Sequence, residues 1–201
     1  NGALNAFAVV AKDNSGAVST SAVQAKVSVT NVNDLSTGAV TISGTATQGQ
    51  ILTATNSLAD VDGLGTVSYQ WLANGAAITG ATASTFTLTQ AQVGKAMSVK
   101  ASYTDLLGTA ESKTSSATTS VVNVNDAPTA SNRNLTVIED TARVLALTDF
   151  GFADVDIGNT LQKVTITTLE TKGALKLNGI DVTLNQVITS ADITAGKLIY
   201  T

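Results

Sequence analysis

The sequence predicts an all-β protein made of small β-sandwich modules in tandem, and three observations support this prediction. Apolar and polar residues alternate along many short segments, turn dipeptides separate these segments, and a group of residues recurs at a fixed distance. No amphipathic helix of credible length interrupts the series. Because about seven short strands per module are typical of a sandwich, we expect two antiparallel sheets packed face to face.

The alternation marks strands that each have one face on a core. Asn74-Gly75 and Asn178-Gly179 are dipeptides that tolerate positive φ and are typical of tight hairpins. Trp71 lies in an alternating segment, so we expect it in a core rather than on a sugar-binding surface. The clearest alternating segments are residues 67–71, 86–89, 97–103, 164–167 and 175–177.

Two module ends can be recognised from a repeat. Asn-Val-Asn-Asp occurs at residues 31–34 and again, 92 residues later, at residues 123–126. The same shift places Asp13 on Asp105, and each of these aspartates is followed three residues later by glycine. Both ends therefore have the same order: a strand, a turn with Asp, a strand rich in Ser and Thr, and the Asn-Val-Asn-Asp segment.

A second repeat follows each of these ends. Ala-Asp-Val-Asp occurs at residues 59–62 and at residues 153–156, at nearly the same distance beyond the preceding Asn-Val-Asn-Asp. We therefore predict three segments in an extended arrangement. They are the closing strands of one module at residues 1–34, a complete module at residues 35–126, and a module lacking its final strands at residues 127–201.

The composition excludes several classes of function. The chain contains neither Cys nor His, which removes the usual general base, thiol nucleophile and transition-metal ligands, so we expect no enzyme activity. Carboxylates alone could form a glycosidase pair, but here they recur with the repeat, and sugar-stacking aromatic residues are few. Fifteen acidic against eleven basic residues argue against a nucleic-acid partner. No apolar stretch is long enough to predict membrane insertion.

The residues resemble known bacterial repeats. Residues 127–201, with Val-Ile-Glu-Asp at 137–140 and Gly-Lys-Leu-Ile-Tyr-Thr at 196–201, resemble the cadherin-like repeats of giant RTX-type adhesins and related surface proteins. Residues 35–126 are similar to the immunoglobulin-like repeats found beside them, on the evidence of Gly65–Trp71 and Tyr103-Thr104-Asp105. The resemblance implies that residues 1–34 end a cadherin-like module. It also implies calcium between modules.

Calcium takes six to eight oxygen ligands, and an Asp-x-Asp loop can direct two carboxylates at one ion. If the fold is a cadherin-like sandwich, acidic and amide side chains meet at the two junctions between modules. For the second junction the predicted ligands are Asp105, Asn125, Asp126, Glu139, Asp140, Asp154 and Asp156. For the first junction they are Asp13, Asn33, Asp34, Asp60 and Asp62, which include fewer acids. The alternative is that these residues only shape turns through side-chain to backbone hydrogen bonds.

The resemblance implies a structural spacer or fibre-forming repeat of a secreted or cell-surface bacterial adhesin. Its expected partners are neighbouring repeats of the same protein. Either head-to-tail copies associate so that residues 1–34 of one complete the module begun by residues 127–201 of the next, or these pieces are covalently continuous in the parent. Two alternatives remain open. A carbohydrate-binding module would show an exposed aromatic platform or a polar cleft, and an accessory domain of a secreted enzyme would accompany a catalytic domain elsewhere in the parent chain.

Overall fold

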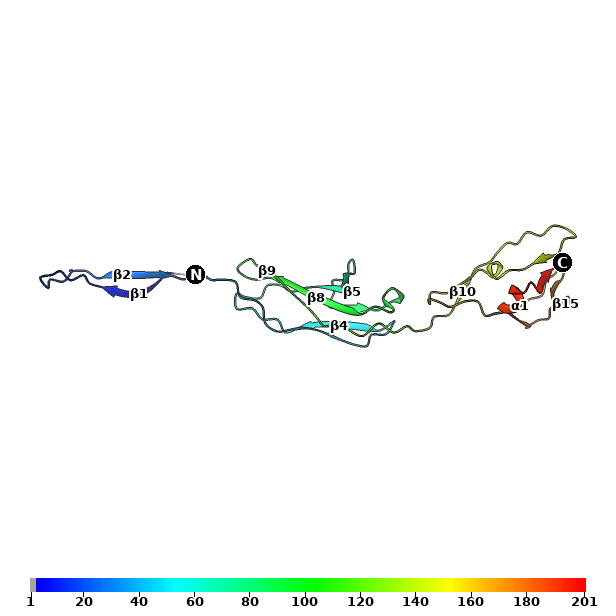
Figure 1. The fold of residues 1–201 in the computed structure, drawn as a ribbon, viewed down its shortest axis with the longest axis horizontal. Coiled ribbons are helices and arrows are strands. Elements are labelled where there is room, and N and C mark those ends of the chain that lie inside the picture. The colour runs from blue at the N-terminus through cyan, green and yellow to red at the C-terminus, as the bar shows by residue number, and fades with distance from the viewer. Residues whose placement is uncertain (1–2) are drawn as a thin grey trace. The chain divides into compact units, whose positions relative to one another are not determined.

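A computed structural model describes residues 3–201, and its regular structure is nearly all β, as predicted (Figure 1). In this part of the chain the one α-helix is α1, Ser190–Thr194, and no helix has the length and apolar character needed to cross a membrane. The chain folds as two units. Unit 1 contains Asn1–Gly44, Ile51–Phe86 and Ala96–Thr119, and unit 2 contains Thr45–Gln50, Thr87–Lys95 and Ser120–Thr201. Residues 1 and 2 of the predicted first segment lie outside the described residues.

Unit 1 begins with an antiparallel hairpin of β1 (Ala3–Val9) and β2 (Val23–Ser28). The hairpin is a sheet of two strands, and its described side chains lie almost entirely in solvent. Phe7 is 59% exposed and Val23 67% exposed, although both have the apolar character of core residues. The hairpin therefore has unpartnered apolar side chains.

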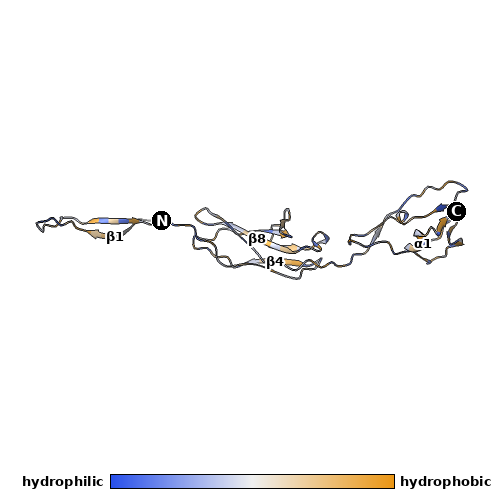
Figure 2. Cartoon of the chain, in the orientation of Figure 1, coloured by the Kyte–Doolittle hydropathy of each residue, from blue (hydrophilic) through white to orange (hydrophobic). Residues whose placement is uncertain are grey.

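Two larger sheets follow. A three-stranded sheet has the order β3-β4-β7, and a four-stranded sheet has the order β6-β5-β8-β9. The first contains β3 (Val40–Ser43), β4 (Ile51–Asn56) and β7 (Thr85–Thr87). The second contains β5 (Ser68–Ala73), β6 (Ala76–Ala77), β8 (Met97–Thr104) and β9 (Ala110–Thr114), and the 3-10 helix η1 spans Gln90–Gln92. The β4 and β8 strands both have hydrophobic stretches (Figure 2).

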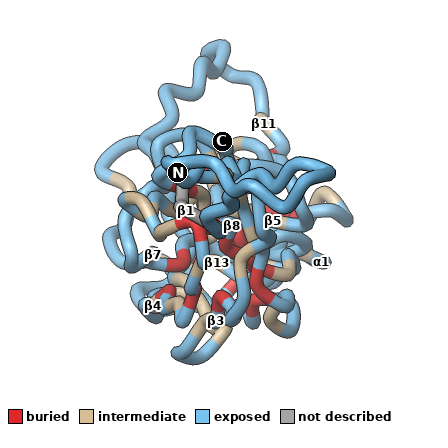
Figure 3. Tube along the Cα trace, turned by 90° about the vertical axis from the view of Figure 1, so that its left-hand side faces the viewer, coloured by how far each residue is buried: buried red, intermediate tan, exposed pale blue. Residues whose placement is uncertain are grey.

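The alternation predicted for these strands is present in their burial. On β8, Val99, Ala101 and Tyr103 are buried at every second position. Buried stretches of the chain are drawn in red in Figure 3. Trp71 on β5 is fully buried, as predicted, and its indole N–H donates to the carbonyl oxygen of Ala83 at 2.9 Å. Burying so large a ring with its one polar group satisfied is a strong stabilising contribution to this part of unit 1.

Unit 2 has shorter strands and three small sheets, ordered β10-β12, β13-β16 and β11-β17-β14-β15. Its core consists of Leu145, Val182, Ile188, Ile193 and Leu198. The strands are β10 (Thr129–Ala130), β11 (Arg143–Val144), β12 (Phe152–Ala153), β13 (Lys163–Thr165), β14 (Leu175–Leu177), β15 (Ile180–Asp181), β16 (Val187–Thr189) and β17 (Leu198–Tyr200), and the 3-10 helix η2 spans Leu147–Phe150.

Both predicted hairpin dipeptides form tight turns. Asn74 and Gly75 connect β5 to β6, and Asn178 and Gly179 connect β14 to β15, all four with positive φ. Positive φ at both central residues is the geometry that suits the twist of a two-residue hairpin, and Asn and Gly adopt it with little strain. The Asn-Gly signal therefore located these turns correctly.

Adjacent residues on β4 allow a direct test of the core. Leu52 is fully buried, whereas Ile51 beside it is 56% exposed. We predict that Leu52→Ala lowers the free energy of unfolding of this region by about 2–5 kcal/mol because it leaves a cavity, whereas Ile51→Ala changes it by less than about 1 kcal/mol. Denaturant unfolding followed by the fluorescence of Trp71, the one tryptophan, measures both. Equal effects of the two substitutions would contradict this assignment of the core.

Candidate functional site

The first Asn-Val-Asn-Asp segment is held by one carboxylate. Asp62 is buried, and its Oδ2 accepts a hydrogen bond from the backbone N–H of Asp34 at 2.7 Å. Its Oδ1 accepts from the side-chain amide of Asn31. The loop that presents Asp62 is closed by a further bond, from the backbone N–H of Asp62 to Asp60 Oδ1 at 2.8 Å. The segment is thus attached to the Asp-x-Asp loop by charge-assisted hydrogen bonds.

The second segment is held in the same way. Asp156 is buried, its Oδ2 accepts from the backbone N–H of Asp126 at 2.7 Å, and its Oδ1 accepts from the side-chain amide of Asn123 at 2.9 Å. The backbone N–H of Asp156 donates to Asp154 Oδ1 at 2.8 Å. Each bond has its counterpart in the first segment, so the repeat seen in the sequence is also a repeat of hydrogen bonds. We call residues 31–36 and the equivalent residues 123–128 the linkers, and we call Asp62 and Asp156 the linker anchors.

A second repeated device is the aspartate turn at the end of each preceding strand. Asp13 Oδ1 accepts from the backbone N–H groups of Ser15 and Ala17, at 3.0 and 2.8 Å. Asp105 Oδ1 accepts from the equivalent N–H groups of Leu107 and Thr109, at 2.9 and 2.7 Å. These oxygens shape turns, which is the alternative role that the sequence left open for the Asx residues.

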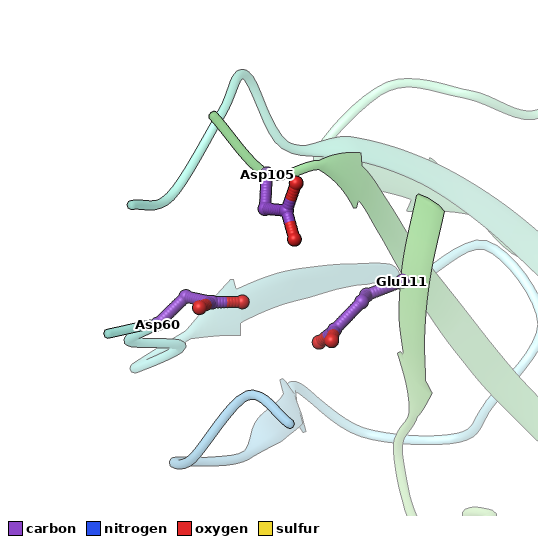
Figure 4. A group of neighbouring side chains, drawn as sticks. All are labelled: Asp60, Asp105 and Glu111. Atoms are coloured by element: carbon purple, nitrogen blue, oxygen red, sulfur yellow. The ribbon is translucent and has the colours of Figure 1, made fainter. Parts of the chain in front are cut away.

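Asp105 also belongs to a cluster of three acids (Figure 4). One carboxylate oxygen each of Asp60, Asp105 and Glu111 lies within 4.8 Å of the others, and within residues 3–201 this is the one such group. The acids come from the loop after β4, the turn after β8 and strand β9. Asp105 is 4% exposed, and its Oδ2 is buried without a hydrogen-bond partner. None of the three ion pairs in the described residues involves these acids.

The Tyr103 hydroxyl lies between two of the acids. It is within hydrogen-bond distance of Asp60 Oδ2 and of Glu111 Oε2, the latter at 2.8 Å. Burial, reinforced by the hydrogen bond to Asp60, raises the pKa of Tyr103, and the bond from Tyr103 is the main cause that lowers the pKa of Glu111 to about 2. The tyrosine is therefore a neutral donor and Glu111 is ionised at neutral pH. One hydroxyl proton cannot satisfy both carboxylates.

Glu111 also connects the acid cluster to the linker. Its Oε2 accepts from the backbone N–H of Ser36 at 2.9 Å, and its Oε1 accepts from the side-chain amide of Asn33 at 3.2 Å. A change of charge in the cluster therefore acts on a residue that holds the linker directly. This connection was not predicted, because Glu111 reaches the cluster only through the register that pairs it with Tyr103 across β8 and β9. One sequence signal could have indicated this connection. With the shift of 92 residues, Glu111 corresponds to Ser19, so the acid is present in only one of the two repeats.

The predicted first-junction residues are partly brought together. Asp34, Asp60 and Asp62 meet as described, and Asn33 contacts Glu111. Asp13 instead lies in its own turn.

The predicted second-junction residues are divided. Asp126, Asp154 and Asp156 lie together, and the Asn125 side chain bonds to the carbonyl oxygen of Asp126 at 3.1 Å. The prediction placed Asp105 here as well, but the structure groups its carboxylate with Asp60 and Glu111. The physical reason is local packing, because the space beside Gly63 is filled by the side chain of Leu106 and the two loops are therefore neighbours.

The acidic pair Glu139 and Asp140 lies in an exposed turn rather than on a strand. The backbone N–H of Thr141 donates to the carbonyl oxygen of Ile138 at 3.1 Å, and Asp140 has a φ of 59°. Neither carboxylate is grouped with Asp154 and Asp156 in the described structure.

No family model, curated protein or solved structure matches this chain. The chemistry of the site therefore has to be argued from its own donors. Three carboxylates in one place, one of them with an unpartnered buried oxygen, are the ligands that calcium prefers, and bringing them together without a cation concentrates like charge. The group that this arrangement suits best is a hard divalent cation.

The anchors can be tested apart from any cation. We predict that Asp156→Ala, measured in chelator, lowers the free energy of unfolding of unit 2 by about 1–3 kcal/mol, because the Asp126 N–H and the Asn123 amide lose a charged acceptor. Glu139→Ala is the control, since it removes an exposed carboxylate outside the anchor, and it should change stability by less than about 0.5 kcal/mol. Scanning calorimetry measures both. An Asp156→Ala protein as stable as the control would show that the anchor contributes nothing.

Proposed function

We propose that this chain is a structural spacer or fibre-forming repeat of a secreted or cell-surface bacterial protein, with calcium bound beside its linkers. The observation that supports this best is the repeated anchor, in which Asp62 and Asp156 hold equivalent linkers through equivalent bonds. A catalytic or ligand-binding site needs one constellation in one place. A device repeated at each linker instead serves the attachment of one module to the next.

The finer architecture we propose is a tandem array of β-sandwich modules, immunoglobulin-like at residues 35–126 and cadherin-like on either side. The sheets β3-β4-β7 and β6-β5-β8-β9 support a two-layered middle module, because β4 and β8 each contribute fully or nearly fully buried apolar residues. The resemblance described above supports the module types and the cell-surface location.

Burial of Trp71 favours the spacer over the carbohydrate-binding alternative. A sugar platform needs an aromatic face in solvent, and Trp71 is fully buried with its ring centroid 5.7 Å from that of Phe86. Sugar-binding modules place such rings at the surface because stacking requires access. In a structural spacer, Trp71 is needed only as part of the hydrophobic core.

Calcium is assigned to Asp60, Asp105 and Glu111, which we call the acid cluster. The unpartnered Oδ2 of Asp105 supports the assignment, because a buried carboxylate oxygen without a partner is costly unless a cation approaches it. Glu111 supports a role in stiffening, because the same carboxylate accepts from Asn33 and Ser36 of the linker. A cation bound there would hold Glu111 in place and, through it, the linker.

The calcium assignment predicts a linked gain in stability. At a calcium concentration about one hundred times the dissociation constant, we expect the free energy of unfolding to rise by about 2.7 kcal/mol relative to chelator. Asp105→Asn should weaken calcium binding by at least about tenfold, because it removes a ligand charge while keeping the Oδ1 acceptor of the turn. Thermal unfolding and titration calorimetry measure these effects.

Asp13→Asn is the matched control for this substitution. Asp13 shapes the same turn, but it is not grouped with other acids in the described structure, so the substitution should leave calcium binding unchanged. Terbium, which replaces calcium and emits when a nearby aromatic ring is excited, gives a second readout, and Tyr103→Phe should weaken that emission if the ion lies at the cluster. Identical melting in calcium and chelator, with no heat of binding, would refute the calcium assignment.

A further inference from the structure

Unit 2 has an open groove between two segments of its own. Three cavities of about 740, 940 and 480 Å³ lie along this groove. One wall is residues 128–137 and the other is residues 158–170, both of which contribute lining residues to the cavities. The apolar lining includes Leu135, Val137 and Leu169, which are 38–43% exposed. The groove is therefore open, lined by both apolar and polar residues, and bounded by two extended segments.

The middle of the chain shows what lies between the equivalent segments there. Thr37 donates its hydroxyl to the carbonyl oxygen of Ala59, and Thr129 does the same to Ala153, so residues 36–38 correspond to residues 128–130. Beside residues 36–38 lies strand β9, whose Lys113 donates to the carbonyl oxygens of Ser36 and Gly38 at 2.9 Å. β9 pairs with β8, and β8 pairs with β5. The position that is a groove in unit 2 is filled by the β8–β9 hairpin in unit 1.

The chain contains a second hairpin of the same kind. The turn of β1–β2 at Asp13 has the same hydrogen bonds as the turn of β8–β9 at Asp105, and the bridge between Lys12 and Val18 matches the pairing of Thr104 with Ala110. With the shift of 92 residues, Phe7 and Val9 correspond to Val99 and Ala101, which are fully buried. In β1 these side chains are 59% and 48% exposed. Within the described residues, that side of the hairpin packs against no core.

We propose that the β1–β2 hairpin of one copy of this chain occupies the groove of unit 2 in a second copy. The occupant is a second copy because the hairpin in the same sequence repeats the one element that fills the equivalent position in unit 1. Such a contact joins two different surfaces, so copies associate head to tail, and they build an open filament where the rotation between copies does not close a ring. The inference deepens the proposed fibre-forming function, on which it rests, by naming the partner.

The docked hairpin would also bring two acids together, while the counterpart of Glu111 in the hairpin is Ser19. In unit 1 the turn aspartate Asp105 lies beside Asp60 of the Asp-x-Asp loop. Asp13 is the counterpart of Asp105, and Asp154, with its bond from the backbone of Asp156, is the counterpart of Asp60. A hairpin seated as β8–β9 is seated would place Asp13 of one copy beside Asp154 of the next.

Single substitutions on each surface test the proposal. Val9→Asp places a charge on the core-facing side of the hairpin, and Val137→Asp places one in the groove. In sedimentation experiments on the 201-residue chain, the average molecular mass of the wild type should increase with protein concentration. Either variant alone should associate at least about tenfold more weakly. Val10→Asp is the matched control, because Val10 directly follows β1, is 53% exposed and corresponds to Ser102, which is only half-buried in β8, and it should associate as the wild type does.

Mixing the two variants distinguishes this arrangement from others. Each keeps one intact surface, so an equimolar mixture should form one-to-one dimers and no longer species. If Val137→Asp alone still associates, the hairpins pair with one another and the proposal is wrong. A wild-type chain that stays monomeric at micromolar concentrations also overturns it. Running the series in calcium and in chelator separates the two proposals, because loss of calcium binding alone would leave association in chelator intact.

The chain has no cysteine, so a directed cross-link can test the geometry. Leu106 covers Gly63 in unit 1, and the counterparts of these positions are Asn14 and the loop at Ile157. A short thiol cross-linker should join Asn14→Cys in one chain to Ile157→Cys in another. Ile180→Cys, also exposed, is the control partner and should give no product with Asn14→Cys. Equal yields with both partners would contradict the proposed docking.

Discussion

This structure depends on one interaction, the hydrogen bond that a backbone N–H of each linker donates to a buried aspartate carboxylate. The Oδ2 atoms of Asp62 and Asp156 each accept a hydrogen bond, at 2.7 Å, from the backbone N–H of the last residue of an Asn-Val-Asn-Asp segment. A buried carboxylate needs donors, and an extended linker has backbone donors without partners of their own. Each group therefore satisfies the other, and the bond fixes where the chain enters the next set of strands.

The same bond positions the rest of the site. Closing the Asp-x-Asp loop leaves Asp60 on the side where Tyr103 and Glu111 lie, and Glu111 in turn contacts the linker at Ser36. The result is negative charge concentrated around one tyrosine hydroxyl, next to a carboxylate oxygen of Asp105 that has no donor. A divalent cation bound at this position would relieve both the repulsion and the missing partner, which is why we propose calcium beside the linker.

Much of the fold follows from patterns that act over a few residues. Alternation placed Val99 and Ala101 of β8 in the core, and Asn-Gly placed two hairpins, because strand pleat and turn φ are local properties. The repeat of Asn-Val-Asn-Asp marked in the sequence both segments that Asp62 and Asp156 hold. The sequence singled out Asp62 and Asp156 as calcium ligands. In this structure their carboxylates accept hydrogen bonds from the linkers, a role that was not predicted for these two residues in particular.

The remaining features depend on register and packing. Glu111 joins the acid cluster because it lies opposite Tyr103 across two strands, and Asp105 joins it because Leu106 packs over Gly63. Linear spacing contains neither fact, so the sequence assigned Asp105 to the other junction and passed over Glu111. Glu139 and Asp140 lie in a local turn with positive φ at Asp140, and their role as calcium ligands stays a prediction.

The central claim, that one buried carboxylate holds each linker, is tested most directly by amide hydrogen exchange. In the native protein the N–H groups of Asp34 and Asp126 should exchange at least about a hundredfold more slowly than in an unstructured peptide, because each is bonded to a buried acceptor. They should become fast in Asp62→Ala and Asp156→Ala respectively, each substitution affecting its own linker. Exchange at unstructured-peptide rates in the native protein, at either residue, would contradict the account.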